Sequence, residues 1–397
     1  MKKRIQRFIL LTSASAMLFF SACKKEISTP NPPSSYTGSN FNDLFDAFWN
    51  GMNNNYVFWD IDTTNWDRVY NQYKPIFANL NIYSDNDVRS SVNYFRQMVA
   101  GLIDGHYNIT FPKSQLLSDS SIDPAFDRKR NTPGYHDPIP LGYFFFDLPK
   151  IFLDSGYVEG VDSTHTARLA VAVSGTINHN ILYFYFNTFE LQALYLTPGS
   201  AVQAVIKNFI SSISPISPSV KGIILDLRGN GGGDVNDLDF LVGRMIDKPL
   251  KFGYTRAKNG QGRLDYSPWA PAIVTPQPGS SAISIPIIVI ADNFSASLSE
   301  ITTLAIKTLP NGKFLGETTW GANGPLAPNV YFNGGQFTAG TILTLSVFTS
   351  STMFKYINDQ IYEGKGIPPD VAVPDNLNSL KRGIDLQVAQ AVSLINQ

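Results

Sequence analysis

The chain of 397 residues contains one cysteine, four histidines and no excess of either charge, with a formal net charge of −1. One cysteine excludes an intrachain disulfide and a cysteine-based zinc site, because each needs at least two thiols. The near-neutral balance gives no electrostatic reason to expect DNA or RNA as a partner. We expect no metal and no organic cofactor. The apolar content of 43% is sufficient for a large core, and the length favours more than one domain.

The single cysteine ends an N-terminal stretch that reads MKKRIQRFILLTSASAMLFFSAC. Basic residues precede an apolar run that is too short for a membrane helix and typical of a secretory signal. Ser21 and Ala22 before Cys23 resemble a bacterial lipobox, in which the chain is cut before the cysteine and lipid is attached to its sulfur. We expect residues 1–22 to be the signal peptide. An ordinary signal peptide with an incidental cysteine is the alternative.

Residues 23–36 follow with the polar, proline-rich sequence KKEISTPNPPSSY after the cysteine, which is typical of a flexible linker. A lipid on Cys23 predicts a protein anchored in the bacterial cell envelope. The outer membrane is the expected site, with the folded part on its periplasmic or surface face.

Three segments follow the linker. Residues 37–111 contain amphipathic helical patterns such as FNDLFDAFWNGM and DVRSSVNYFRQMVAGL, which predict a helical domain. Residues 112–185 form a long polar loop and then a β-rich segment that includes LGYFFFDL and ARLAVAVSG. Residues 186–397 alternate buried strands, such as KGIILDL and IPIIVIA, with helices. This alternation predicts an α/β layer with parallel strands.

Two loops of the α/β segment carry candidate chemistry. The loop DLRGNGGG, residues 226–233, leaves a strand, and its glycines let backbone N–H groups approach an anion or an oxyanion. It matches neither GxGxxG nor a P-loop, so a nucleotide site is disfavoured. The loop NFSASLSE, residues 293–300, puts serines at a helix start. The alternatives are structural: the glycine loop would be only a tight turn, and the serines would only cap the helix.

Taken together, DLRGNGGG, SASLSE and GETTWG resemble the motifs of the S41 peptidase family, the tail-specific or C-terminal processing proteases. The resemblance implies a ClpP/crotonase-like α/β core, and it makes Ser297 the nucleophile. The oxyanion hole would combine the N–H of Gly231 or Gly232 with that of Leu298. Glu300, at the end of SASLSE, would play a supporting role.

The better-known branch of that family uses a lysine base at the position that Ala322 occupies here. Lys307 and Lys313 lie outside that position and are expected to be solvated. A second branch, similar to the tricorn core and to the interphotoreceptor retinoid-binding repeats, uses a histidine from a DGH turn. In this sequence the turn reads LIDGHYNITF, so the resemblance makes His106 the base. Glu363 of IYEGKGIPPDVAV would orient the imidazole with an ionised carboxylate.

Three classes of function remain open. The first is an envelope serine peptidase that acts on polypeptides, and the second is a catalytically inactive binding protein on the same fold. The third is a structural lipoprotein that presents the domain to a partner. Many relatives carry a PDZ domain before the core, but residues 135–185 are too few for a full one. The sequence does not indicate an oligomeric state.

Overall fold

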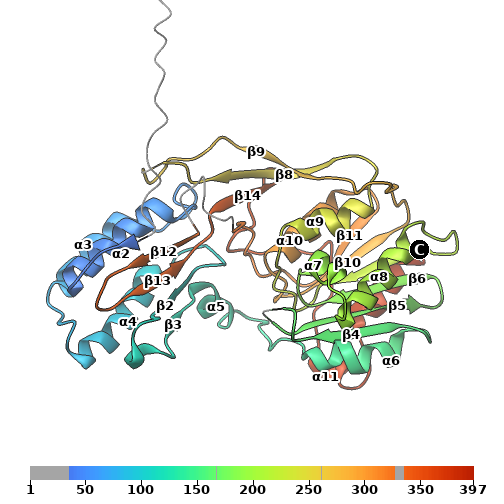
Figure 1. Cartoon of the computed structure of the whole chain (residues 1–397), viewed down its shortest axis with the longest axis horizontal. Coiled ribbons are helices and arrows are strands. Elements are labelled where there is room, and N and C mark those ends of the chain that lie inside the picture. Colours follow the sequence, from blue (N-terminus) through green and yellow to red (C-terminus); the bar gives the residue numbers. More distant parts are fainter. Residues whose placement is uncertain (1–34, 167, 261, 327–334) are drawn as a thin grey trace, which may run out of the picture.

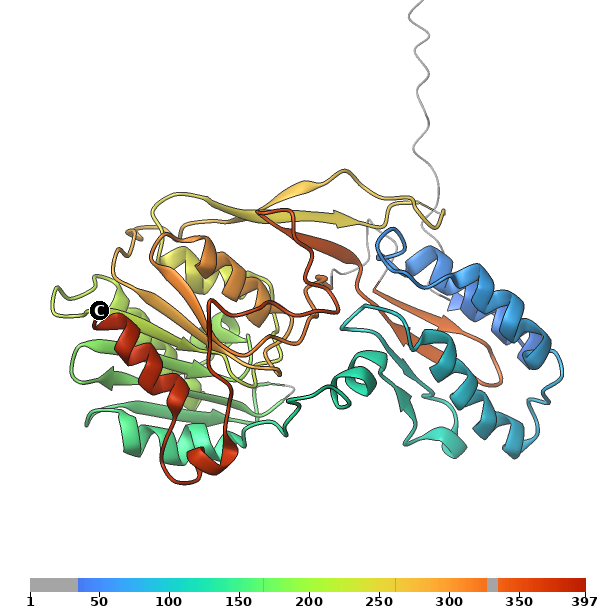
Figure 2. The same ribbon diagram turned by 180° about the vertical axis from the view of Figure 1, so that it is seen from behind.

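The computed structural model describes residues 35–397, apart from residues 167, 261 and 327–334 (Figure 1). The expected signal peptide and Cys23 lie outside the described residues. Among the helices that are described, none has the length and apolar character needed to cross a membrane. Figures 1 and 2 show two globular parts, a helical domain in blue and cyan and an α/β core, connected by chain at more than one place.

The N-terminal domain packs three helices against a small five-stranded sheet. Its strand order is β1-β12-β13-β2-β3, so two strands from the C-terminal third of the chain complete it. Apolar side chains repeat along one side of each helix and are buried together with the sheet, for example Phe45, Phe48 and Phe95. The bounds are α2 Phe41–Asn55, α3 Trp66–Phe77, α4 Asp85–Val99, β1 Ser35–Tyr36, β2 Asn108–Thr110, β3 Ser121–Ile122, β12 Gln336–Ala339 and β13 Leu345–Phe348.

The core is built on a seven-stranded sheet of order β15-β11-β10-β7-β6-β5-β4. Strands β6, β7, β10, β11 and β15 run parallel, whereas β4 and β5 are antiparallel to their neighbours. The bounds are β4 Val158–Asp162, β5 Ala170–Ile177, β6 Ile181–Phe186, β7 Gly222–Asp226, β10 Ile287–Ala291, β11 Gly312–Gly316 and β15 Val371–Ala372.

Both faces of this sheet are covered, which explains its continuous apolar strands. Alternate side chains point to opposite faces. Phe184 and Leu225 pack against one group of helices, and Tyr183 and Ile224 pack against another. The first group is α7 Leu191–Leu196, α8 Ala201–Ile213, α9 Asn236–Leu241, η3 Val242–Arg244 and α10 Leu298–Thr308. The second is η2 Tyr143–Asp147, α6 Leu148–Phe152, α11 Leu377–Leu380 and α12 Leu386–Ile395.

A third sheet, of order β14-β8-β9, reaches from the core toward the helical domain, as both views show. Its strands are β8 Leu250–Ala257, β9 Ala270–Val274 and β14 Thr352–Tyr356. The side chain of Arg256 on β8 forms an ion pair with Asp60 of the helical domain. The sheet therefore links the two parts through side chains as well as through the chain itself.

The structure corrects the expected boundary at residue 185. Strands β4, β5 and β6 belong to the core sheet, because β6 pairs in parallel with β7 along residues 181–185. The stretch LGYFFFDL is helical and not β. Its Tyr143, Phe144 and Leu148 side chains are buried, and the Phe144 ring stacks on the Tyr185 ring of the sheet with 4.0 Å between their centres. The expected loop of residues 112–140 contains η1 Gln115–Leu117, β3 and α5 Pro124–Lys129.

Candidate active site

Ser297 stands at the carboxyl edge of the core sheet, in the turn between β10 and α10. It is one of four described non-glycine residues with positive φ, at φ 57° and ψ −121°. Such a backbone costs on the order of 1–3 kcal/mol and persists only where the surroundings enforce it. The side chain is partly exposed. The turn therefore holds Ser297 in a strained conformation at an accessible edge of the sheet, where sites of α/β proteins form.

The other two serines of the motif are buried and occupied. The Ser295 hydroxyl donates to the Leu227 carbonyl oxygen at 2.7 Å, and the Ser299 hydroxyl donates to the Asn230 carbonyl oxygen at 2.7 Å. Both bonds attach the serine turn to the loop after β7. These two serines hold the turn in place, and Ser297 is the one of the three that reaches solvent.

The glycine loop lies directly against the serine. A β-carbon on Gly232 would come within 2.6 Å of the Ser297 β-carbon and 2.8 Å of the Leu298 nitrogen. The Gly232 N–H donates to the Asn230 side chain at 2.8 Å, so it is already in use. Within the described residues, the N–H groups of Gly231 and Leu298 have no hydrogen-bond acceptor. Of the two glycines expected in an oxyanion hole, Gly231 is the one whose N–H is unused.

Glu300 connects the serine turn to residues 319–322. One carboxylate oxygen accepts from the Ser297 and Ala322 N–H groups at 3.2 and 2.7 Å. The other accepts from the Gly321 N–H at 2.8 Å and the Thr319 hydroxyl at 2.5 Å. The side chain is buried, and this burial raises the pKa of Glu300 against the effect of its hydrogen bonds. Four donors on one carboxylate indicate a structural support for the turn.

His106 is brought to the same place by the segment around Ala322. A β-carbon on Gly105 would lie 2.7 Å from the Ala322 β-carbon, and the Trp320 indole donates to the Gly105 carbonyl oxygen at 3.2 Å. Because Ala322 shares Glu300 with Ser297, the histidine turn and the serine turn meet across this segment. No hydrogen bond joins Ser297 to His106 in the described part of the chain.

The imidazole belongs to a polar cluster with Asp104 and Glu363. One ligand-type atom of each lies within 4.8 Å of the other two, so this cluster could also hold a metal ion. His106 Nδ1 lies 3.3 Å from the Ser350 hydroxyl oxygen, which donates to the Asp104 carboxylate at 2.8 Å. The described contacts therefore connect the imidazole to Asp104 through Ser350.

Glu363 is close to the imidazole but is bonded elsewhere. Its two oxygens accept from the Gly105 and Gly324 N–H groups at 2.7 and 2.6 Å. Burial, and then the neighbouring Asp104, raise the pKa of Glu363 well above its usual value. This opposes the expectation of a freely ionised carboxylate. In the structure Glu363 fixes the backbone beside the imidazole, and its role as the orienting group stays a prediction.

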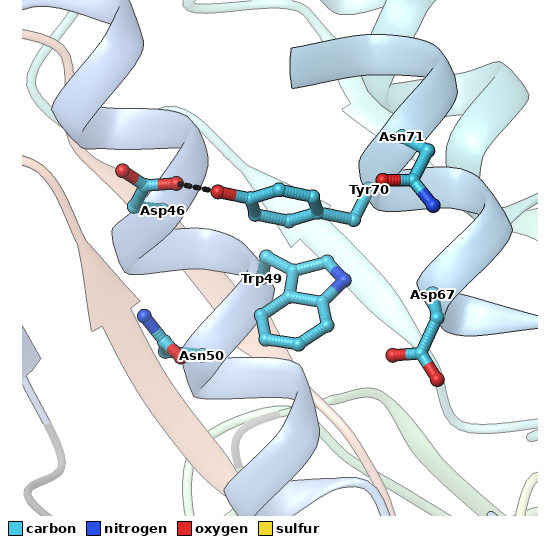
Figure 3. Close-up of a pocket in the computed structure, with 6 residues that line it drawn as sticks. All are labelled: Asp46, Trp49, Asn50, Asp67, Tyr70 and Asn71. Atoms are coloured by element: carbon cyan, nitrogen blue, oxygen red, sulfur yellow. Dashed lines mark hydrogen bonds between the residues drawn. The ribbon is translucent and has the colours of Figure 1, made fainter.

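An open pocket of about 530 Å³ lies elsewhere, between α2 and α3 of the helical domain. Figure 3 shows the Trp49 ring between polar side chains of α2 and α3, with Tyr70 bonded to Asp46. The six lining residues are Asp46, Trp49, Asn50, Asp67, Tyr70 and Asn71. The pocket holds none of the expected catalytic residues.

The glycine loop, the serine turn and the Glu363 segment all lie in a part of the chain that is similar to known proteins. Residues 180–373 match the sequence profile described as Peptidase family S41. Residues 180–373 belong to peptidase family S41.

Several relatives are similar to parts of this S41 chain. The tricorn protease of Thermoplasma acidophilum is 27% identical over 177 residues, which cover 45% of this chain and 14% of that protein. The carboxy-terminal-processing protease of Bartonella bacilliformis is 24% identical over 293 residues, covering 74% and 59%. The nisin-resistance protein of Lactococcus lactis is 26% identical over 209 residues, covering 51% and 61%. The matched region is thus less than two thirds of each relative.

Solved structures show the same fold over most of the described S41 chain. A candidate peptidase of Parabacteroides merdae superposes with a TM-score of 0.64 at 22% identity, covering 90% of this chain and 97% of that one. Mature CPAF superposes with a TM-score of 0.58 at 13% identity, covering 89% and 95%. The α/β fold with an N-terminal helical part, expected from the motifs, is confirmed.

Two electrostatic features of this S41 site bear on the choice of base. Burial lowers the pKa of His106 below its usual value, and Asp104 opposes this only in part, so the imidazole is neutral at neutral pH.

Lys129 is a second candidate for the general base, and the sequence did not single it out. Its ammonium group donates to the Thr319 carbonyl oxygen at 2.8 Å and to the Asn293 side chain at 3.2 Å.

Burial lowers the pKa of Lys129 to about 8, close to the range of a base at neutral pH. The group also lies 5.0 Å from the centre of the Trp320 ring. By contrast, Lys307 forms an ion pair with Asp370 near the far end of α10, and Lys313 is exposed at the start of β11. Nothing in the sequence around Lys129 marks it, because its contacts lie more than 160 residues away.

Proposed function

We propose that this protein is a cell-envelope serine peptidase in which Ser297 is the nucleophile and His106 is the general base. The observation that carries the proposal is the strained, partly exposed Ser297 against a glycine loop, with a neutral imidazole in the adjoining turn. Membership of a peptidase family supports a polypeptide substrate. Lipid on Cys23 and anchoring in the envelope remain part of this proposal and rest on the sequence.

The reaction follows from the groups present. His106 takes the proton of the Ser297 hydroxyl as its oxygen attacks the peptide carbonyl carbon. The developing oxyanion accepts hydrogen bonds from the unused N–H groups of Leu298 and Gly231. The imidazolium then gives its proton to the leaving amine, and water repeats the sequence to release the acyl group. The Ser350 hydroxyl contacts the other imidazole nitrogen, Nδ1, and is itself hydrogen-bonded to Asp104.

The proton transfer requires the Ser297 hydroxyl and the imidazole to come within hydrogen-bond distance. Catalytic hydrogen bonds are often long or absent before substrate binds, so the free structure does not oppose this step. A catalytically inactive binding protein on the same fold is the second candidate. The observation that favours it is that Ser297 and His106 share no hydrogen bond in the described structure.

A serine-reactive fluorophosphonate probe separates the two. In an active peptidase the probe is expected to label Ser297 alone, and peptide mapping by mass spectrometry locates the adduct. Ser297→Ala is expected to remove the label and about 10³-fold or more of the activity. A folded protein that takes no label, or one labelled on Ser295 or Ser299, would contradict the assignment.

A further inference from the structure

A second cluster of metal-binding side chain types lies outside the proposed catalytic machinery. His136, Glu317 and Asp375 come from three segments that are far apart in the sequence, and one ligand-type atom of each lies within 4.8 Å of the others. Glu317 directly follows β11, and Asp375 follows β15 by a few residues. His136 lies in the segment after α5, with its ring 5.8 Å from that of Phe294. The cluster therefore joins this segment to the edge of the core sheet.

The imidazole of His136 is already oriented as in a metal ligand. Its Nδ1 lies 2.7 Å from the Asp137 carbonyl oxygen. A carbonyl oxygen only accepts, so Nδ1 carries the hydrogen and Nε2 faces the Glu317 carboxylate at 2.9 Å. Histidines that bind metals commonly donate their other N–H to a carbonyl oxygen in this way. A proton on Nε2 gives an ion pair with Glu317, and a metal ion would replace that proton.

Asp375 supplies an independent observation. Its side chain is only 2% exposed, and its Oδ2 has no hydrogen-bond partner in the described structure. Among the described residues, the groups near it that can carry a positive charge are Arg228, at 3.8 Å from Oδ1, and the His136 imidazole of the same cluster. Arg228 lies closer to two other carboxylates, Asp226 at 2.5 Å and Asp385 at 2.9 Å. A buried carboxylate oxygen without a donor or cation is costly.

The local charges favour uptake of a cation. Four carboxylates, those of Asp226, Asp375, Asp385 and Glu317, adjoin the guanidinium of Arg228 and the imidazole of His136. With all four carboxylates ionised and the imidazole protonated, two negative charges remain uncompensated (four minus two). The side chains of Arg228, Asp226, Asp375 and Asp385 are at most 2% exposed. Glu317 accepts the backbone N–H of Asp375 at 2.9 Å. A divalent ion at Asp375 would balance this excess.

We propose that His136, Glu317 and Asp375 bind one divalent transition-metal ion, with zinc as the best fit. One imidazole nitrogen and two carboxylate oxygens are a ligand set that zinc accepts, with water as a fourth ligand. Magnesium and calcium prefer sites made of oxygen atoms alone. Zinc at 2.0–2.2 Å from each ligand separates the ligand atoms by about 3.3 Å, so His136 and Glu317 need to move apart by a few tenths of an ångström. The ion would fix the segment after α5 to the core.

The test uses the whole protein after removal of metals with a chelator, and it does not depend on peptidase activity. Calorimetric titration with zinc is expected to show one tight site, with heats that change with the ionisation enthalpy of the buffer because a proton leaves His136. Zinc is expected to raise the melting temperature, whereas magnesium is not. His136→Ala and Asp375→Asn are each expected to weaken zinc binding by about 100-fold or more.

Two control variants decide where the zinc binds. His165 is paired with a single carboxylate, Asp162, so His165→Ala is expected to leave zinc binding unchanged. His106→Ala removes the other three-residue cluster and is also expected to leave this site intact. Absence of zinc binding to the native protein would overturn the proposal and leave His136 and Glu317 as an ion pair only. Loss of zinc in His106→Ala with full binding in His136→Ala would also overturn it.

Discussion

Gly105 and Ala322 touch: a β-carbon on Gly105 would lie 2.7 Å from the β-carbon of Ala322. Position 322 is where the better-known branch of the S41 family has its lysine. The turn that carries His106 thus packs against the backbone at that very position. A lysine side chain at position 322 would need the space that the His106 turn occupies. This gives a physical reason why a chain that uses the histidine lacks the lysine.

Ala322→Lys tests this competition. The longer side chain is expected to displace the histidine turn, lowering the free energy of unfolding by about 1–3 kcal/mol and reducing peptidase activity. Urea unfolding and kcat/KM measure the two effects. Leu326→Lys is the control, since Leu326 is 40% exposed in the same segment. A stable Ala322→Lys protein with increased activity would mean that the two bases can coexist.

The pH dependence of kcat/KM distinguishes the two candidate bases. A general base works when it has lost its proton, so activity rises with pH through the pKa of that base. Burial lowers the pKa of His106, so the rising limb is expected below its ordinary value and the profile is flat above it. If Lys129 were the base, activity would rise through a pH of about 8.

Variants of the two candidate bases give an independent answer. His106→Ala is expected to lower kcat by about 10³-fold or more, and Lys129→Met is expected to retain a profile with the same midpoint. The reverse pattern would assign the base to Lys129. Circular dichroism and melting curves of both variants exclude loss of fold as the cause.

The backbone strain at Ser297 has a measurable size. Glycine tolerates φ 57° and ψ −121° better than alanine does, and neither substitution retains the hydroxyl. Ser297→Gly is therefore expected to be more stable than Ser297→Ala by about 1 kcal/mol or more in urea unfolding.

Ser84 provides the matched comparison, because it caps α4 with an ordinary φ of −92°. Its Gly and Ala variants give the preference of a helix cap without strain. If the difference at Ser297 did not exceed the difference at Ser84, the turn would store no strain.

The two glycines of the loop should respond differently to alanine. Gly232 has φ 92° and its added β-carbon would clash with Ser297, so Gly232→Ala is expected to lower both the melting temperature and kcat/KM, the latter by about 10²-fold or more. The nearest atom to a β-carbon on Gly231 is 3.9 Å away, on Arg168. Gly231→Ala keeps the N–H and is expected to stay close to native in both measurements. If both variants had equal effects, the close approach of Gly232 to Ser297 would not explain the loss.

Cys23→Ala tests the lipid anchor. The protein is expected to move from the membrane fraction to the soluble fraction, because position 23 would no longer have a thiol to which lipid can be attached. Incorporation of a labelled fatty acid into the native protein, and not into the variant, is the direct measurement. Unchanged membrane association and mobility of the variant would favour an ordinary signal peptide or another anchor.

Local patterns predicted the parts of the fold that are locally determined. The apolar runs of β7 and β10 and the loops after them could be read directly, because buried parallel strands have continuous apolar sequences. The run LGYFFFDL was misread, since a short aromatic stretch suits a strand and a buried helical turn equally well. Its stacking on Tyr185, about forty residues away, decides between the two.

The site was predictable where motifs carry it and not where distant segments meet. Ser297 and His106 could be located by motif, although their catalytic roles stay predictions. Asp104 is part of the same DGH turn, but its bonds to Thr349 and Ser350 span 245 residues or more, so its link to the imidazole through Ser350 had no local signal. The proposed zinc ligands His136, Glu317 and Asp375 also come from segments that are far apart in the sequence.

Because β12 and β13 return to the N-terminal sheet, we expect that the helical domain does not fold as a separate fragment. A chain that ended before residue 336 would leave β2 and β3 as a bare hairpin and remove Phe337, Leu345 and Val347 from the core around Phe48. Two isolated strands are marginally stable at best in water. Truncation or domain exchange at the expected boundary is therefore expected to yield insoluble protein, and engineering of this chain has to keep the first and last thirds together.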